Sequence, residues 1–148
     1  MIIEEVMDEA GDRLKTITIS GNKKLNHVSY SDDADEIKCP ASMISLPTNI
    51  DYEGTFQNGL HEYDIIVTVL VSLVDSKIRR KEIAPFGDSV GNMSIKSKLD
   101  FPSAVGGSDY DSCDTFTVQR GSFTIVTIGE VTYKAFIATC KVTGSGRA

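Results

Sequence analysis

The run IIVTVLVSLV at residues 65–74 is the longest apolar stretch in this chain, and it constrains the fold more than any other feature. It is too short to cross a membrane as a helix, and its β-branched residues favour a strand. The surrounding pattern predicts one long strand over residues 60–73. Every second residue from Tyr63 to Val71 would face the core, because neighbouring side chains of a strand point to opposite faces.

The opposite face of this strand is too apolar to lie open to water. Ile66 and Leu70 point to that face, among the more polar Asp64, Thr68 and Ser72. We therefore expect a helix or a neighbouring subunit to cover part of it.

The other segments predict an α+β domain with a mostly antiparallel sheet flanked by two or three short helices. Helices are expected at residues 2–14, 75–86 and 95–99, and Ser94 is placed to cap the last of them. Further strands are expected at residues 15–20, 39–47, 50–57, 115–119, 122–128 and 131–142. The segment 39–47 lies between two prolines, which suits an edge strand better than a central one.

Two dipeptides predict tight turns between strands. Asn58-Gly59 would join residues 50–57 to 60–73, and Gly129-Glu130 would join the last two strands. Residues 21–24 look like a turn, and residues 144–148 should form a flexible, frayed tail. The 148 residues are expected to form a single domain, residues 1–148.

The composition is that of a soluble globular protein, with 41% hydrophobic and 24% charged residues and a net charge of −6. The largest basic cluster is KIRRK at 77–81, so a nucleic-acid groove is not expected. That cluster is interpreted as an exposed helix face, with an acidic partner surface as the alternative. The N-terminus lacks the pattern of a signal peptide. Three widely spaced cysteines, Cys39, Cys113 and Cys140, suggest reduced thiols in a cytoplasmic setting.

The segment FGDSVGNMSIKSKLD at residues 86–100 invites an esterase interpretation, because its Gly-Asp-Ser resembles the block that carries the nucleophile of some serine esterases. A serine nucleophile at Ser89 needs a base and an acid that orients it. The two histidines, His27 and His61, both lie upstream, and neither belongs to an Asp-x-x-His pair. A turn is the better interpretation of Ser89.

The same segment also resembles a phosphate-binding loop, through its spaced glycines and Lys96. Such a loop needs Gly-Lys-Ser/Thr, and here Asn92 and Met93 follow Gly91. The segment therefore predicts a polar loop that ends one helix and caps the next, with no catalytic or cofactor-binding residues.

Metal ligands are equally sparse, since the histidines and cysteines show no paired spacing. Asp109, Asp111 and Asp114 in SDYDSCD could bind Ca²⁺, but the glycine and distant glutamate of an EF-hand are missing. A solvated acidic loop is expected there, and no metal site. Cys140, within a strand, is expected to be a small core residue.

One ordered set of motifs spans residues 47–142. It begins with P-x-x-I-D-Y-x-x-T-F-x-x-G-L-x-E-Y and continues with the valine-rich strand and VDSKIRRKEIAPFGDSVGNMSIKSKLD. It ends with AVGG and FTVQRGSFTIVTIGEVTYKAFIATCKV. This order resembles the tail-terminator and neck proteins of long-tailed bacteriophages. Asn58 departs from the family pattern, where arginine is common.

The resemblance implies a ring, usually of six subunits, at the head-proximal end of the tail tube. Such a ring stops tube polymerisation and joins the tail to the head connector, so its partners would be the major tail-tube protein and a connector or stopper protein. DNA would pass through the lumen without specific binding. The protein would act by binding, without catalysis or cofactors, in the virion after assembly in the host cytoplasm.

Candidate contact residues follow from this implication. The subunit or partner interface is expected to include Ile66, Leu70, Phe116, Arg120 and Phe123. Acidic residues expected to face the lumen are Asp109, Asp111 and Asp114, because negative charge there would repel the phosphates of the passing genome. The alternative is Asp32–Glu36, in the acidic loop expected at residues 31–38.

Three other hypotheses remain open. A head-completion or stopper protein of the same neck is the nearest, although the expected helices favour a terminator. A small hydrolase would use Ser89 or Cys113. A monomeric ligand-binding domain would have a pocket along the face of residues 63–71.

Overall fold

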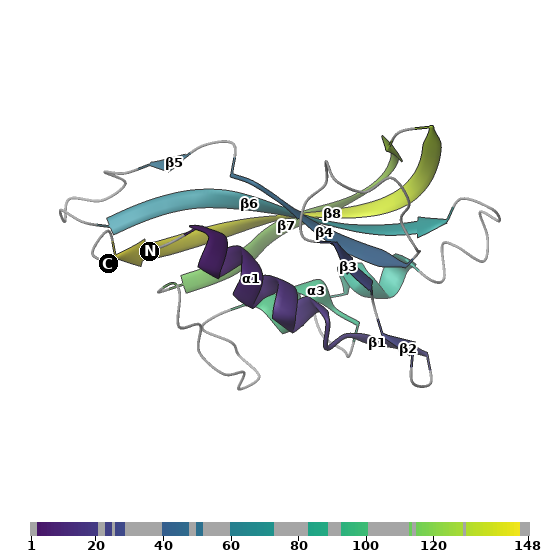
Figure 1. The fold of residues 1–148 in the computed structure, drawn as a ribbon, viewed down its shortest axis with the longest axis horizontal. Coiled ribbons are helices and arrows are strands. Elements are labelled where there is room, and N and C mark those ends of the chain that lie inside the picture. Colours follow the sequence, from purple (N-terminus) through teal and green to yellow (C-terminus); the bar gives the residue numbers. More distant parts are fainter. Residues whose placement is uncertain are drawn as a thin grey trace.

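The computed structural model describes residues 3–20, 23–24, 26–28, 40–47, 50–51, 60–72, 83–88, 93–100, 113, 115–128 and 130–145. They form an α+β fold, as predicted, with one six-stranded sheet and a separate two-stranded ribbon (Figure 1). The helices are α1 (Ile3–Leu14), α3 (Ile95–Leu99) and the 3₁₀ turn η1 (Ala84–Gly87). The strands are β1 (Thr18–Ser20), β2 (Lys23–Lys24), β3 (Asn26–Val28), β4 (Ala41–Ser45), β5 (Ile50–Asp51), β6 (Leu60–Ser72), β7 (Thr115–Ile128) and β8 (Val131–Ser145).

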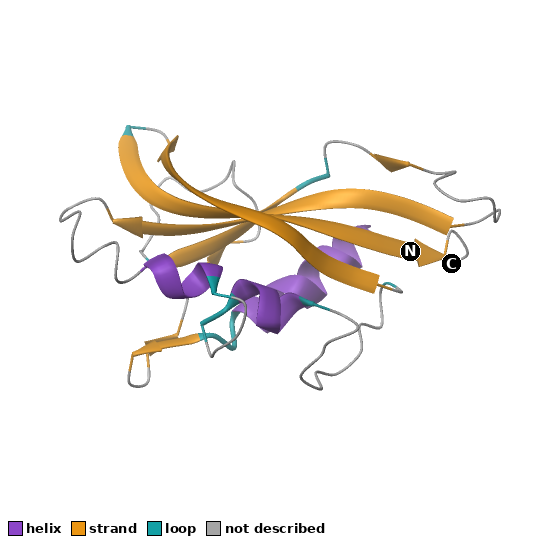
Figure 2. Cartoon of the chain, turned by 180° about the vertical axis from the view of Figure 1, so that it is seen from behind, coloured by secondary structure: helices purple, strands orange, loops and turns teal. Residues whose placement is uncertain are grey.

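The large sheet has the strand order β3-β4-β6-β8-β7, and β5 pairs with the beginning of β6. Only β3 and β4 run parallel; the other described pairs are antiparallel. The helices lie together on one face of this sheet (Figure 2). None of the helices in the described ranges is long and apolar enough to span a membrane.

The main core lies between the sheet and these helices. On β6, the predicted alternation is confirmed, because Tyr63, Ile65, Val67, Val69 and Val71 all belong to this core. From α1 the core receives Val6, Met7, Ala10 and Leu14, which recur at helical spacing. Each fully buried aliphatic side chain contributes about 1.5–3 kcal/mol, so the paired apolar faces of strand and helix stabilise each other.

A second, smaller apolar cluster lies on the opposite face of the sheet. Leu70 is completely buried there, beside Met43, Tyr133 and Ala135. Among the described residues, Leu70 is thus packed against side chains of β4 and β8, whereas the sequence had suggested cover by a helix or another subunit. Ile66 on the same face is half-buried.

The strand β4 is not the edge strand that its flanking prolines suggested. It pairs with β3 on one side and with β6 on the other. Pro40 and Pro47 lie just outside the strand, so neither removes an N–H from the hydrogen-bond ladder.

The predicted two-residue turn at Asn58-Gly59 is wrong in register. Such a turn would place Ile50 opposite Val67, whereas Ile50 lies opposite Tyr63. The reason is that Val67 already pairs with Ile44 of β4, which leaves only the beginning of β6 free on that side. Residues 52–59 themselves lie outside the described residues.

The last two strands form one long hairpin. The two strands expected at residues 115–119 and 122–128 are a single strand, β7, with a bulge between Val118 and Arg120. The two-residue turn is confirmed, because Ile128 pairs with Val131. At the other end, Gly144 and Ser145 still belong to β8, so the expected flexible tail is wrong at these two residues. Residues 146–148 lie outside the described residues.

The structure tests only part of what was expected for residues 15–38 and 75–86. The strand expected at residues 15–20 is the shorter β1, and it pairs with β2 within the segment expected to be a turn. The helix expected at residues 75–86 lies mostly outside the described residues, apart from its end at Ile83 and η1. The acidic segment at residues 31–38 also lies outside them.

Candidate interaction site

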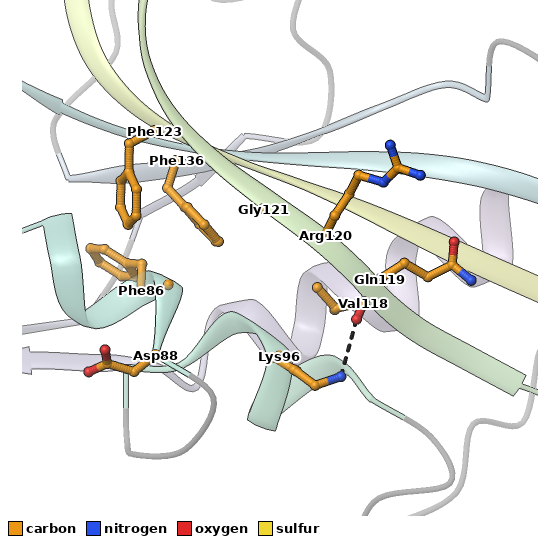
Figure 3. Close-up of a pocket in the computed structure, with 10 residues that line it drawn as sticks. Phe86, Asp88, Lys96, Val118, Gln119, Arg120, Gly121, Phe123 and Phe136 are labelled. Atoms are coloured by element: carbon orange, nitrogen blue, oxygen red, sulfur yellow. Dashed lines mark hydrogen bonds between the residues drawn. The ribbon is translucent and has the colours of Figure 1, made fainter.

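A hollow of about 240 Å³ lies where η1 and the start of α3 meet the middle of β7 (Figure 3). We call it the β7 groove. It is lined by Phe86, Gly87, Asp88, Lys96, Val118, Gln119, Arg120, Gly121, Phe123 and Phe136. Its position beside an edge strand makes it a candidate interaction site.

The bulge in β7 decides which side chains reach this groove. Before the bulge, Val118 lies opposite Cys140 and faces the helices; after it, Gly121 lies opposite Ala138 on that same face. The extra residue, Gln119, therefore changes the alternation from even to odd positions. As a result Phe123 and Ile125 lie on the helix side of the sheet.

Two glycines allow aromatic rings to lie close to the backbone. A Cβ at Gly121 would be 2.5 Å from the ring of Phe136, and a Cβ at Gly87 would be 2.7 Å from the ring of Phe123. The two rings also contact each other, with centroids 5.0 Å apart. The glycines thus let Phe123 and Phe136 join the hairpin to η1.

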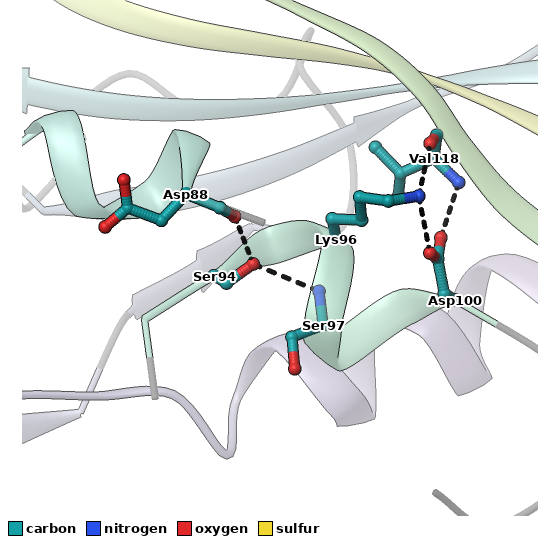
Figure 4. Close-up of polar contacts among 6 residues, drawn as sticks. All are labelled: Asp88, Ser94, Lys96, Ser97, Asp100 and Val118. Atoms are coloured by element: carbon teal, nitrogen blue, oxygen red, sulfur yellow. Dashed lines mark hydrogen bonds and ion pairs between the residues drawn. The ribbon is translucent and has the colours of Figure 1, made fainter. Parts of the chain in front are cut away.

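An ion pair on α3 closes the edge of β7 at the bulge (Figure 4). Asp100 Oδ1 accepts a hydrogen bond from the backbone N–H of Val118 at 2.7 Å, and Lys96 Nζ donates to the Val118 carbonyl at 3.1 Å. Lys96 and Asp100 also pair with each other at 2.7 Å. Both outward backbone groups of Val118 are therefore satisfied by side chains, and no added strand can pair there.

Beyond the bulge, no described strand pairs with this edge. Among the described strands β7 has one partner, β8, which bonds to alternate residues of β7. In a two-residue hairpin, the residues that flank the turn, here Ile128 and Val131, form a hydrogen-bonded pair. Every second residue of β7 before Ile128 bonds to β8 in the same way. The backbone groups of the residues between them, Thr127, Ile125 and Phe123, therefore point away from β8. Phe123 is 52% and Ile125 is 61% exposed, so this stretch has both free backbone groups and apolar side chains.

The serine at the start of α3 has a structural role. Ser94 is buried; its Oγ accepts a hydrogen bond from the N–H of Ser97 at 3.1 Å and donates to the carbonyl of Asp88. The predicted helix cap is confirmed. Ser89, the residue of the esterase interpretation, lies outside the described residues.

The described cysteines belong to the core. Burial, with a smaller contribution from Asp100, raises the pKa of the Cys140 thiol to about 12. This thiol is therefore protonated at neutral pH and is a poor nucleophile. Cys113 is also buried, whereas Cys39 lies outside the described residues.

Tyr63 carries a buried polar group in the same core. Burial raises the pKa of its phenol, with a smaller contribution from Cys113. Its hydroxyl makes no hydrogen bond within the part of the chain that the structure describes.

The five expected interface residues separate into two groups. Arg120 and Phe123 are exposed at the β7 groove, and Ile66 is half-buried on the other face. Phe116 and Leu70 are completely buried within the chain, so they are core residues and offer no surface to a partner. For Leu70, alternation along β6 predicted the correct face of the sheet but not what covers it.

The expected acidic lumen residues, Asp109, Asp111 and Asp114, all lie outside the described residues. Within the described ranges, no three His, Cys, Asp or Glu side chains gather closely enough to hold a metal ion.

Sequence reasoning missed two features beside the groove. It gave no role to Ile125, although this residue lay within the strand expected at residues 122–128. It also missed the ion pair of Lys96 and Asp100, although their spacing of four residues on a helix was a visible signal.

Comparison with models of known protein families finds no match to this sequence. A search of curated proteins likewise finds no significant relative.

Proposed function

We propose that this chain is a structural virion protein of a long-tailed bacteriophage, forming a ring at the head-proximal end of the tail tube. The ring would end tube polymerisation and join the tail to the head connector. A head-completion or stopper protein of the same interface is the alternative. The basis is the order of motifs over residues 47–142, which resembles the tail-terminator and neck family.

The structural observation that carries the proposal is the outer half of the β7–β8 hairpin. It bends away from the rest of the sheet (Figure 1), and residues 119–125 of β7 are all exposed. Phe123, Ile125 and Val131 are large apolar side chains that are at least half exposed there. Exposed apolar side chains on a free edge strand favour contact with another protein chain.

The polar side chains around the β7 groove support a binding role more than a catalytic one. Ser94 caps α3, and Lys96 is held between Asp100 and the Val118 carbonyl. Each of these groups stabilises a loop or a strand edge, so the groove has a fixed shape that a partner can recognise.

The net charge of −6 is compatible with a channel for DNA. A ring of several copies would concentrate negative charge around its lumen, and this charge would repel the phosphates of the genome. We propose Asp109, Asp111 and Asp114 for this role. Replacing all three by Asn should preserve assembly but slow DNA passage, and unchanged infectivity would contradict the role.

The test is the mass of the purified protein by light scattering, alone and after mixing with tail-tube subunits. The monomer has a mass of 16.1 kDa, and a species near six times that mass is expected on the tube or in solution. Added protein should also cap growing tubes and shorten them. A protein that stays monomeric and leaves tube length unchanged contradicts the proposal, whereas binding to the connector without binding to the tube favours the stopper.

A further inference from the structure

The outer half of β7 lacks the devices that normally protect an edge strand. Residues 119–127 contain no proline and no lysine, and Arg120 is their single charged residue. An unprotected edge offers its free N–H and C=O groups to another strand. The side chains of α3 close this edge at Val118, so the open stretch begins after the bulge.

On the helix side of the open stretch, the residue two positions before Phe123 is small and the residue two positions after it is large. Gly121 lies two residues before Phe123 and borders the β7 groove without a side chain. Ile125 lies two residues after Phe123 and carries an apolar side chain that is 61% exposed. An antiparallel copy of the same strand, centred on Phe123, would therefore place an isoleucine beside a glycine at both ends.

We propose that β7 pairs edge to edge with β7 of a second copy of this chain, around a two-fold axis at Phe123. Phe123 of each copy then lies opposite Phe123 of the other, and each Ile125 lies opposite Gly121 of the other copy. The backbone groups of these residues point to the open side, so they form hydrogen bonds across the axis. The same register places Arg120 opposite Val126, which keeps the two positive charges apart.

This contact favours a second copy over an unrelated strand because each copy supplies both the exposed Ile125 and, over Gly121, the ring of Phe136 against which that side chain can pack. The two phenylalanines add an aromatic cross-strand pair, and Ile125 loses its contact with water beside the groove. Each Phe123 ring is already held against its own Gly87 and Phe136, so it is ordered before pairing.

The contact does not rest on the proposed ring. A ring requires head-to-tail contacts between different surfaces, whereas this pairing joins identical surfaces. The two proposals therefore fail separately, since loss of the edge contact need not prevent a ring.

The first test measures the mass of the full chain over a concentration series by analytical ultracentrifugation. We expect Ile125→Lys to raise the dissociation constant of the dimer at least about tenfold, because a charged edge side chain opposes strand pairing. The matched control is Thr117→Lys, an exposed position on the same strand before the bulge, which should leave the constant unchanged. A chain that is monomeric at every concentration overturns the proposal, as does an assembly of any size whose mass Ile125→Lys does not reduce.

The second test checks the register. Directly opposed residues of a hydrogen-bonded pair have Cα atoms about 5.5 Å apart, within the range of a disulfide. Phe123→Cys should therefore cross-link to itself under mild oxidation with copper phenanthroline, and Thr117→Cys should not. If Thr117→Cys cross-links at least as fast as Phe123→Cys, the two-fold axis is not at Phe123.

Discussion

The two halves of the β7–β8 hairpin have opposite environments, although they belong to the same pair of strands. At the base, Phe116 is fully buried, and Lys96 and Asp100 close the edge at Val118. In the outer half, Phe123 and Ile125 are half or more exposed, and no strand in the described part of the chain pairs with the edge. The difference shows that the bulge divides β7 into a part that stabilises the fold and a part that is available for binding.

The largest effect should come from the base. Phe116→Ala removes a completely buried ring from the main core and should lower the free energy of unfolding by about 3–5 kcal/mol. Urea denaturation followed by circular dichroism measures this loss. A loss below about 1 kcal/mol would mean that the base is not part of the core.

A smaller effect should arise at the bulge itself. Gly121→Val places a Cβ in a position that is 2.5 Å from the ring of Phe136. The ring must move, which should cost about 1–3 kcal/mol of stability. Adding Phe136→Leu should recover part of this loss in a double-mutant cycle; strict additivity of the two changes would contradict the contact.

Removal of the acceptor that closes the edge should cost a similar or slightly smaller amount. Asp100→Ala leaves the N–H of Val118 without its partner and should cost about 1–2 kcal/mol. Asp100→Asn keeps an acceptor oxygen and serves as the matched control with a smaller loss. Equal losses in the two variants would assign the effect to the ion pair instead of the backbone hydrogen bond.

A pH series can test whether water reaches the core at the base of the hairpin. Cys140 pairs with Val118, and burial raises the pKa of its thiol from 9.0 to about 12. The folded chain thus holds this proton more tightly than the unfolded chain. Its contribution is fully present below pH 9 and is lost as pH rises toward 12, by about 1 kcal/mol at pH 10.

Cys140→Ala lacks this titration, so the stability difference between the two chains should shrink by that amount between pH 8 and pH 10. A difference that stays constant over this range would show that water reaches Cys140.

The smallest effect is expected in the outer half. Phe123→Ala removes a half-exposed ring and its contact with Phe136, so it should lower monomer stability by about 1 kcal/mol or less. The measurement is the same urea denaturation, at a concentration where the chain is monomeric. A loss as large as that of Phe116→Ala would abolish the distinction between the two halves.

Several parts of the fold could be predicted because they depend on residues close together in sequence. The cap by Ser94 needs only the N–H of Ser97, three residues away. The two-residue turn before Val131 is likewise a local feature. The alternation on β6 also required no knowledge of its partners, because a strand with one apolar set of side chains must bury that set.

Other parts could not be predicted because they depend on competition between distant segments. Ile50 cannot pair with Val67 because β4 reaches that position first. Leu70 is surrounded by residues from β4 and β8, which no local pattern could identify.

The sequence by itself determined the fold class, the core face of β6, the α3 cap and the final turn, because each follows from short-range geometry and the burial of apolar side chains. Only the tertiary structure decided which face Phe123 and Ile125 occupy, since one extra residue at the bulge reverses every later side chain of the strand. It also decided where the edge of β7 is closed, because Lys96 and Asp100 reach Val118 only after α3 packs beside that strand.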